Sequence, residues 1–189
     1  MLVCIDPGHN YGLNGLGKDP GAVNNELGLK ESVIALEIAI TLGSYLKSEG
    51  IECIYTRTNG KELGLMERCR YANGHKADLF ISIHLNAADN ISANGIETLR
   101  YPTKSEKTIK LAKLVQDSLI EATGARDRGV KERPNLCVLK HTDMPAILIE
   151  VGFISNKEEA LKLNDPPYQR KLCTAICNAV VNWRSTYES

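Results

Sequence analysis

Polar side chains with metal-binding and acid–base chemistry lie in or after three apolar segments of the sequence. His9 and His84 come at or just after the end of an apolar run, and Glu150 is the lone charged residue within Ala146–Phe153. Apolar runs of this length are typical of buried β-strands. Ligands of an open α/β sheet bind outside the carboxyl ends of its parallel strands. We therefore expect the three side chains to converge at that edge of the sheet.

Glu31, in the first turn of a predicted helix, completes a candidate ligand set with His9 and His84. A catalytic zinc ion typically takes three protein ligands from His, Asp and Glu, and it leaves a fourth position for water. The first turn of a helix favours an ionised carboxylate, which is the form that binds a metal. These three residues predict a Zn²⁺ site and a zinc hydrolase.

Glu150 is expected to act on protons rather than to bind the metal. It lies within the segment Ala-Ile-Leu-Ile-Glu-Val-Gly-Phe, where ionising an unpaired carboxylate costs several kcal/mol. Such surroundings raise the pKa of a carboxyl group toward neutrality. A group with that pKa takes a proton from an attacking water and delivers it to a departing amine.

Three further polar residues are candidates for supporting roles at the site. Asn86 is placed either to orient His84 or to bind substrate. Arg57 is a candidate to brace a loop through an ion pair. Glu97 is a candidate to hold a ligand imidazole in one tautomer, as carboxylates often do at metal centres.

The elements that must position these residues alternate between apolar β-type runs and segments of helical periodicity, which indicates an α/β domain. The longest irregular stretch, residues 10–28, is rich in glycine and is expected to be a functional loop. The closing helix is expected to start after Pro166 and Pro167. We predict strands at 2–6, 52–56, 79–84, 95–101, 136–139 and 146–151, and helices at 29–49, 65–73, 106–123 and 168–183.

Composition excludes several classes of partner. The 189 residues are 43% apolar, and 23 basic residues balance 23 acidic ones, so no net field favours nucleic acid. No apolar stretch approaches the ~20 residues that span a bilayer, so no membrane insertion is expected. Gly12 to Lys18 nearly matches a phosphate-binding loop, but Asp19 stands where that motif needs Ser or Thr, so no nucleotide is expected.

The N-terminus and the cysteines suggest where the chain is made. Met1 leads directly into an apolar run, without the basic segment, long apolar region or cleavage site of a secretory signal. Six cysteines form no CxxC pair, which favours reduced thiols over a disulfide framework. We expect synthesis in the cytoplasm without a signal peptide.

Several motifs together resemble the zinc-dependent N-acetylmuramoyl-L-alanine amidases, a family of bacterial autolysins and phage endolysins. The resemblance implies a single α/β domain with a mixed, mostly parallel, twisted sheet flanked by helices on both faces. It also implies Zn²⁺ held at His9, Glu31 and His84, and catalysis by Glu150. The implied substrate is peptidoglycan, cut at the amide between N-acetylmuramic acid and L-alanine of the stem peptide. The motifs are Ile5–His9, Asp19–Ala22, Gly28–Glu31, Tyr55–Arg57, Asp78–Ala87, Gly95–Thr98 and Met144–Phe153.

Several segments that family members often carry are not visible in this sequence, and this affects the expected domain organisation and site of action. No wall-binding module, signal peptide or helix that plugs the zinc site is visible in the sequence, so residues 1–189 are expected to form one catalytic domain. Such a domain is either a phage endolysin that reaches the cell wall after release or a catalytic fragment of a secreted wall enzyme. Two alternatives stay open: a zinc peptidase or amidohydrolase acting on another wall amide, and a non-catalytic peptidoglycan-binding domain. The sequence does not determine the oligomeric state.

Overall fold

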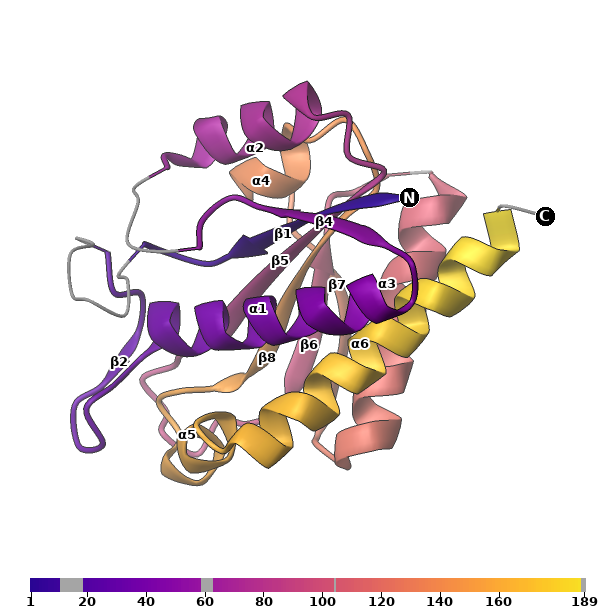
Figure 1. Cartoon of the computed structure of the whole chain (residues 1–189). Helices are drawn as coiled ribbons and strands as arrows, with labels where there is room; N and C mark the ends of the chain where they lie inside the picture. The colour runs from indigo at the N-terminus through magenta and orange to yellow at the C-terminus, as the bar shows by residue number, and fades with distance from the viewer. Residues whose placement is uncertain (11–18, 59–62, 104, 188–189) are drawn as a thin grey trace.

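A mixed sheet forms the centre of the computed structural model, which describes residues 1–10, 19–58, 63–103 and 105–187 (Figure 1). Within these residues the sheet has six strands in the order β4-β1-β5-β8-β6-β7. Its strands are β1 (Leu2–Pro7), β4 (Glu52–Tyr55), β5 (Leu79–Asn86), β6 (Ile96–Arg100), β7 (Asp127–Glu132) and β8 (Ala146–Phe153). A separate antiparallel hairpin pairs β2 (Val23–Asn24) with β3 (Leu29–Lys30).

Strand direction divides the sheet into two parts. Strands β4, β1, β5 and β8 are parallel to one another. Strand β6 is antiparallel to β8, and β7 is parallel to β6. The carboxyl ends of four strands therefore share one edge with the beginnings of β6 and β7. This confirms the predicted mixed, mostly parallel sheet.

Helices cover both faces of the sheet, as predicted (Figure 1). Helices α1, α3 and α6 pack on one face, and α2 and α4 lie on the other. Helix α5 packs against β8 and α6. The helices are α1 (Glu31–Ser48), α2 (Leu65–Gly74), α3 (Glu106–Thr123), α4 (Cys137–Lys140), α5 (Lys157–Leu163) and α6 (Pro166–Tyr187).

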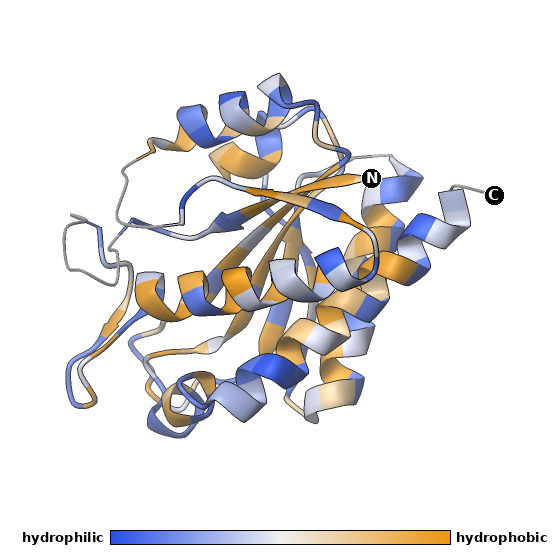
Figure 2. Cartoon of the chain, in the orientation of Figure 1, coloured by the Kyte–Doolittle hydropathy of each residue, from blue (hydrophilic) through white to orange (hydrophobic). Residues whose placement is uncertain are grey.

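The central strands are mostly hydrophobic (Figure 2), and successive side chains along each strand point to opposite faces of the sheet. In β5, Ile81 and Ile83 join the large core under α1, α3 and α6, whereas Phe80 joins the smaller core under α2 and α4. His84 differs from Phe80 by an even number of positions, so it lies on the α2 and α4 face. Glu150 lies on that face for the same reason, because Leu148 belongs to the smaller core.

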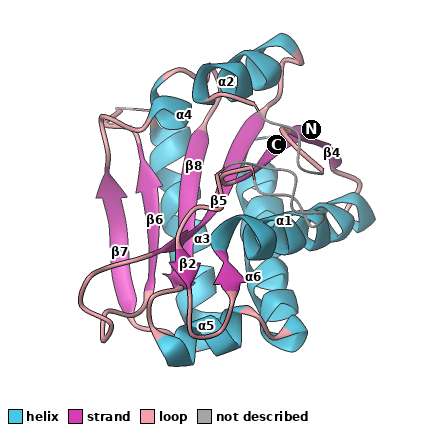
Figure 3. Ribbon diagram, turned by 90° about the vertical axis from the view of Figure 1, so that its left-hand side faces the viewer, coloured by secondary structure: helices cyan, strands magenta, loops and turns pink. Residues whose placement is uncertain are grey.

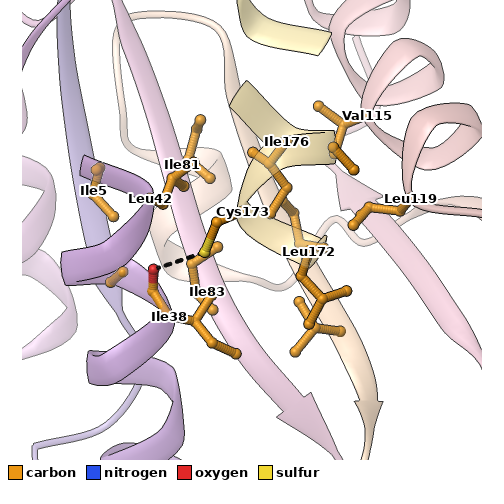
Figure 4. Close-up of a cluster of buried hydrophobic side chains, with 14 of the residues drawn as sticks. Ile5, Ile38, Leu42, Ile81, Ile83, Val115, Leu119, Leu172, Cys173 and Ile176 are labelled. Carbon is orange, nitrogen blue, oxygen red and sulfur yellow. Dashed lines mark hydrogen bonds between the residues drawn. The ribbon is translucent and has the colours of Figure 1, made fainter. Parts of the chain in front are cut away.

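The large core holds α1 firmly against the sheet. Figure 4 shows Ile38 and Leu42 of α1 beside Ile81 of β5 and Leu172 of α6, and all four side chains are fully buried. Each such side chain stabilises the fold by about 1.5–3 kcal/mol. The Cys173 thiol donates to the Ile38 carbonyl at 3.4 Å. Helix α1 therefore carries Glu31, its first residue, on a rigid support.

Some predicted elements were wrong. The expected strand at 136–139 is the short helix α4, Cys137–Lys140, because four apolar residues do not distinguish a strand from a helix turn. The edge strand β7, Asp127–Glu132, was missed because its charged sequence lacks an apolar pattern. Pro166 and Pro167 do not precede the last helix but begin it, since the first turn of a helix tolerates proline.

Part of the glycine-rich stretch 10–28 is ordered as the β2–β3 hairpin rather than being irregular throughout. The phosphate-loop-like segment 12–18 lies outside the described residues. All six cysteines are free thiols. None of the helices in the described part of the chain has both the length and the apolar character to cross a membrane.

Candidate metal centre

His9, Glu31 and His84 come together at the carboxyl edge of the parallel strands. His9 follows β1, His84 lies in β5, and Glu31 begins α1. Each offers a ligand atom, and these three atoms lie within 4.8 Å of one another. His84 Nδ1 is 2.8 Å from Glu31 Oε1, and His9 Nε2 is 3.1 Å from Glu31 Oε2. The structure thus gathers the three residues that the sequence proposed as ligands.

Two glycines make this close approach possible. A Cβ atom at Gly8 would lie 2.5 Å from the His84 ring, and one at Gly21 would lie 2.6 Å from both Glu31 Oε2 and the His9 ring. His9 itself has φ of 60°, a left-handed conformation uncommon for a residue with a side chain. The backbone is therefore shaped around the three side chains, which agrees with strain concentrating at functional sites.

The Glu31 carboxylate is buried and held in its charged form. Its two oxygens accept the backbone N–H groups of Leu85, at 3.0 Å, and Ala22, at 2.9 Å. Burial alone would raise the pKa of Glu31, but hydrogen bonding with His84 and His9 outweighs burial and holds that pKa well below its usual range. A permanently ionised carboxylate is thus available between the two imidazoles.

Asp19 orients the His9 imidazole from its other side. Asp19 Oδ2 lies 2.8 Å from His9 Nδ1, which leaves Nε2 facing Glu31. Burial lowers the pKa of His9, but hydrogen bonds with Glu31 and Asp19 raise it to about 9. The pKa of Asp19 is lowered, since the bond to His9 outweighs the opposing effect of burial. A carboxylate on the second nitrogen of a histidine is a common way to orient a metal ligand.

The donor set fits a zinc ion. Two imidazoles and one carboxylate are the ligands of many catalytic zinc sites, with bonds of about 2.0–2.2 Å. One ligand atom from each of the three residues lies within 4.8 Å of the other two, so the three side chains converge on one point. The glycine contacts and the Asp19 bond add the restricted geometry that a metal site needs.

Glu150 lies beside this cluster without being part of it. It pairs in register with His84 across strands β8 and β5. Its Oε2 atom is buried and has no hydrogen-bond partner among the described residues. Burial raises the pKa of Glu150 to about 7, although His84 opposes this rise. The carboxyl group can therefore exchange a proton near neutral pH, as the role suggested by the sequence requires.

A buried network of hydrogen bonds holds the end of β1 in place. The Asp6 carboxylate accepts hydrogen bonds from Thr56, Ser82 and Arg68 at 2.6–2.7 Å. Arg68 also donates to the His9 carbonyl at 2.6 Å. Asp6 and Arg68 therefore position the backbone of His9. Sequence reasoning missed this role, although a charged residue at the end of an apolar strand was a usable signal.

Arg57 and Glu97 make contacts other than the expected ones, and substrate binding by Asn86 stays a prediction. Arg57 is buried and braces the site through the carbonyls of Pro7, Gly8 and Ser32 rather than through an ion pair. The Asn86 side chain accepts from the backbone of its own neighbour and shows no bond to His84 among the described residues. Glu97 bonds to two cations, described below, and the expected carboxylate contact to an imidazole is made by Asp19.

A cleft of about 380 Å³ opens beside the cluster. His9, His84 and Asp19 line it together with apolar residues of α2, α4 and β8 and of the segments that precede the two helices. These apolar residues are Leu63, Leu65, Leu136, Cys137, Val138 and Leu148. The cleft is large enough to admit part of a peptide or sugar next to the two imidazoles.

An α/β domain with a His-Glu-His cluster and a neighbouring buried acid defines the class of the protein as a candidate metal-dependent hydrolase. Comparison with known proteins gives the family. A model of the N-acetylmuramoyl-L-alanine amidases matches residues 3–182. The chain belongs to this family, as its motifs predicted.

Individual relatives agree with this assignment. N-acetylmuramoyl-L-alanine amidase LytC of Bacillus subtilis (strain 168) is 37% identical to this chain, in an alignment that covers 96% of this chain and 35% of LytC. An endolysin of Bacillus phage SPP1 is 40% identical over 86% of this chain and 58% of the endolysin. This chain thus spans about a third of LytC. The crystal structure of an N-acetylmuramoyl-L-alanine amidase from Clostridium difficile 630 is similar with a TM-score of 0.92 and 34% identity, covering 98% of this chain and 97% of that one.

Proposed function

We propose that this protein hydrolyses the amide between N-acetylmuramic acid and L-alanine in peptidoglycan, and that it does so with Zn²⁺. One observation carries the proposal: the His9, Glu31 and His84 cluster lies beside the unpartnered Glu150 in a chain that matches the amidase family over residues 3–182. Substrate cleavage and zinc dependence are both part of the proposal.

His9, Glu31 and His84 are proposed to hold the metal. When bound there, Zn²⁺ supplies Lewis-acid chemistry, which polarises a carbonyl and lowers the pKa of a water molecule. Asp19 keeps the His9 imidazole in the tautomer that presents Nε2 to the site. Asp6 and Arg68 hold the His9 backbone, so the loop presents that imidazole in a fixed direction.

Glu150 is proposed to be the proton carrier of the reaction. With a pKa of about 7 it is partly ionised at neutral pH, so it accepts a proton from the attacking water. It then donates that proton to the nitrogen of L-alanine as the amide bond breaks. Its pairing in register with His84, a proposed metal ligand on the neighbouring strand, supports this role.

The chain is proposed to act as a single catalytic domain on the cell wall, either as an endolysin or as part of a wall autolysin. A cell-wall site of action is supported by relatives that include LytC and a phage endolysin. Peptidoglycan is the proposed partner, and no nucleotide or nucleic acid is proposed.

Digestion of purified peptidoglycan tests the proposal. The protein is incubated with it, with and without a zinc chelator, and products are analysed by mass spectrometry. We expect free stem peptides that begin with L-alanine, released from intact glycan strands, and loss of this release when the chelator is present. Chelator-treated protein given Zn²⁺ again serves as the control and should recover.

Other outcomes identify the alternatives. Zinc-dependent cuts inside the stem peptide would identify a peptidase. Binding of peptidoglycan without any new amine would identify a binding domain. If stem peptides are still released in the presence of the chelator, the proposed amidase activity stands and the proposed zinc dependence is wrong.

A further inference from the structure

A row of charged side chains continues from Glu150 toward the β7 edge of the sheet. Glu97 of β6 pairs in register with Glu150 of β8, so the two carboxylates lie on the same face. Glu97 Oε2 is 2.7 Å from Arg128 Nε and 2.5 Å from Lys131 Nζ, both on β7. Following the strand order β5-β8-β6-β7, the row runs from His84 through Glu150 and Glu97 to two cations.

Helices cover this part of the sheet on one side. In Figure 3, α3 lies behind the sheet next to β6, whereas no described helix crosses in front of the middle of β6 and β7. The side chains of Arg128 and Lys131 are 26% and 31% exposed, while that of Glu97 is only 5% exposed. A buried carboxylate therefore holds two partly exposed cations in place.

The charges at the β7 end of this row do not cancel. Among the described residues Glu97 is the one acidic group that contacts either cation, so one negative charge faces two positive ones. Arg128 is fixed further by the Asn94 carbonyl, at 3.4 Å, and by the Phe153 ring, whose centroid is 4.8 Å away. Lys131 uses one bond to Glu97 and keeps donors for another group. The row thus offers a preorganised site for an anion.

Strand spacing sets the distance between this anion site and the reaction. Neighbouring strands lie about 4.8 Å apart. The charged ends of Arg128 and Lys131 reach back from β7 to Glu97 of β6, so they lie between one and two strand spacings, about 5–10 Å, from β8, the strand of Glu150. An extended peptide advances about 3.3–3.6 Å per residue. A peptide that leaves the scissile amide and runs across β6 therefore reaches the cations with its second or third residue.

We propose that Lys131 and Arg128 bind a free carboxylate of the stem peptide, two to three residues beyond the amide that is cut. This inference rests on the proposed function. It makes the β7 cations determinants of substrate specificity, because they favour stem peptides whose carboxylates are free over those whose carboxylates are amidated. The cations bind substrate and take no part in proton transfer.

The test uses soluble muramoyl tetrapeptides in matched forms. In one pair the free carboxylate of the second residue is either left as the acid or converted to the carboxamide, and in the other pair the same change is made at the third residue. Steady-state kinetics of the zinc-loaded protein are measured on all four. We expect the acid form of one pair to have a kcat/KM about tenfold higher, the effect of one charge-assisted hydrogen bond.

Three variants separate binding from folding. Lys131→Met should raise KM about tenfold for the preferred acid form, with little change in kcat and no change on its carboxamide. Lys131→Arg should restore the preference. Lys113→Met removes an equal charge from an exposed side chain of α3, on the other side of the sheet. It should change the cleavage kinetics of neither the acid nor the carboxamide form.

Each contrary outcome has a distinct meaning. Equal cleavage of acid and carboxamide forms by the wild-type protein would overturn this inference and leave the amidase intact. An equal loss on both forms in Lys131→Met would also overturn it, because a damaged fold or a disturbed Glu150 gives that result. Failure to cleave any of the four substrates would overturn the proposed function and this inference with it.

Discussion

The two faces of the central sheet differ in what covers them and in what they bury. The face under α1, α3 and α6 is sealed and aliphatic, and its fully buried strand residues include Val3, Ile5, Ile81, Ile83, Ile147 and Ile149. The face under α2 and α4 is covered at one end only, and it carries Asp6, Ser82, His84, Glu97 and Glu150. The same strands supply both sets of residues.

The two faces of the sheet show how the same strands support both the stability of the fold and the chemistry of the site. Successive side chains of a strand point to opposite faces, so Ile149 and Glu150 are chain neighbours with opposite surroundings. Burying Ile149 stabilises the fold, whereas burying the Oε2 atom of Glu150 without a partner costs free energy. Stability and activity should therefore separate at the level of single residues.

The largest expected effect is that of Glu150→Gln on turnover. The amide keeps the shape of the side chain but carries no exchangeable proton of suitable pKa, so amidase activity should fall by about 10³-fold or more. The free energy of unfolding in urea should stay within about 1 kcal/mol of the wild-type value, because the amide has nearly the same size and shape as the carboxyl group and creates no cavity. Zinc binding, measured by calorimetry, should persist. Full activity of this variant would end the assignment of Glu150.

The neighbouring substitution Ile149→Ala should have the opposite profile. Truncating this fully buried side chain should lower the free energy of unfolding by about 2–5 kcal/mol. Activity per folded molecule should stay near the wild-type level, because the side chain faces away from the cluster. Ile91→Ala is the matched control: Ile91 is 74% exposed, so the same truncation there should cost less than about 0.5 kcal/mol. A specific loss of activity in Ile149→Ala would break the division between the faces.

Two glycines with the same backbone angle test how tightly the site is built. Gly21 and Gly28 both have φ of +67°, but a Cβ at Gly21 meets Glu31 and His9, whereas one at Gly28 meets nothing within 4 Å. Gly21→Ala should reduce activity by about 100-fold through displaced ligands. Gly28→Ala should cost only about 1 kcal/mol of stability from its left-handed backbone. Equal effects on activity would show that backbone strain, and not crowding at the cluster, is responsible.

The smallest effect concerns the carboxylate that orients His9. Asp19→Asn keeps a side chain of the same size but weakens the bond to His9 Nδ1, so zinc affinity should fall about 10-fold to 100-fold. Competition with a chelator of known affinity measures this change. Asp143→Asn, at an exposed acid far along the chain from the cluster, is the control and should leave zinc affinity unchanged. An unaltered affinity in Asp19→Asn would limit Asp19 to a structural role in its loop.

Much of this protein follows from its sequence because strand and helix patterns are local. Alternation and helical periodicity depend on residues a few positions apart, and they predicted most of the strands and the long helices. A charged residue inside an apolar strand, such as Glu150, or a histidine at the end of one, such as His84, is visible in the same way. The α/β class and the candidate ligands were therefore accessible from the residues alone, and the family followed from the resemblance of the motifs.

Other features were decided only when the strands took their places. Asp19 acts on His9 because a loop with a left-handed Gly21 turns its carboxylate toward the imidazole. Glu97 bonds Arg128 and Lys131, more than thirty positions away, because β6 and β7 pair at the sheet edge. Such contacts depend on the path of the whole chain, which no short window of sequence contains. Local pattern determined which residues could do chemistry, and tertiary packing decided which of them meet.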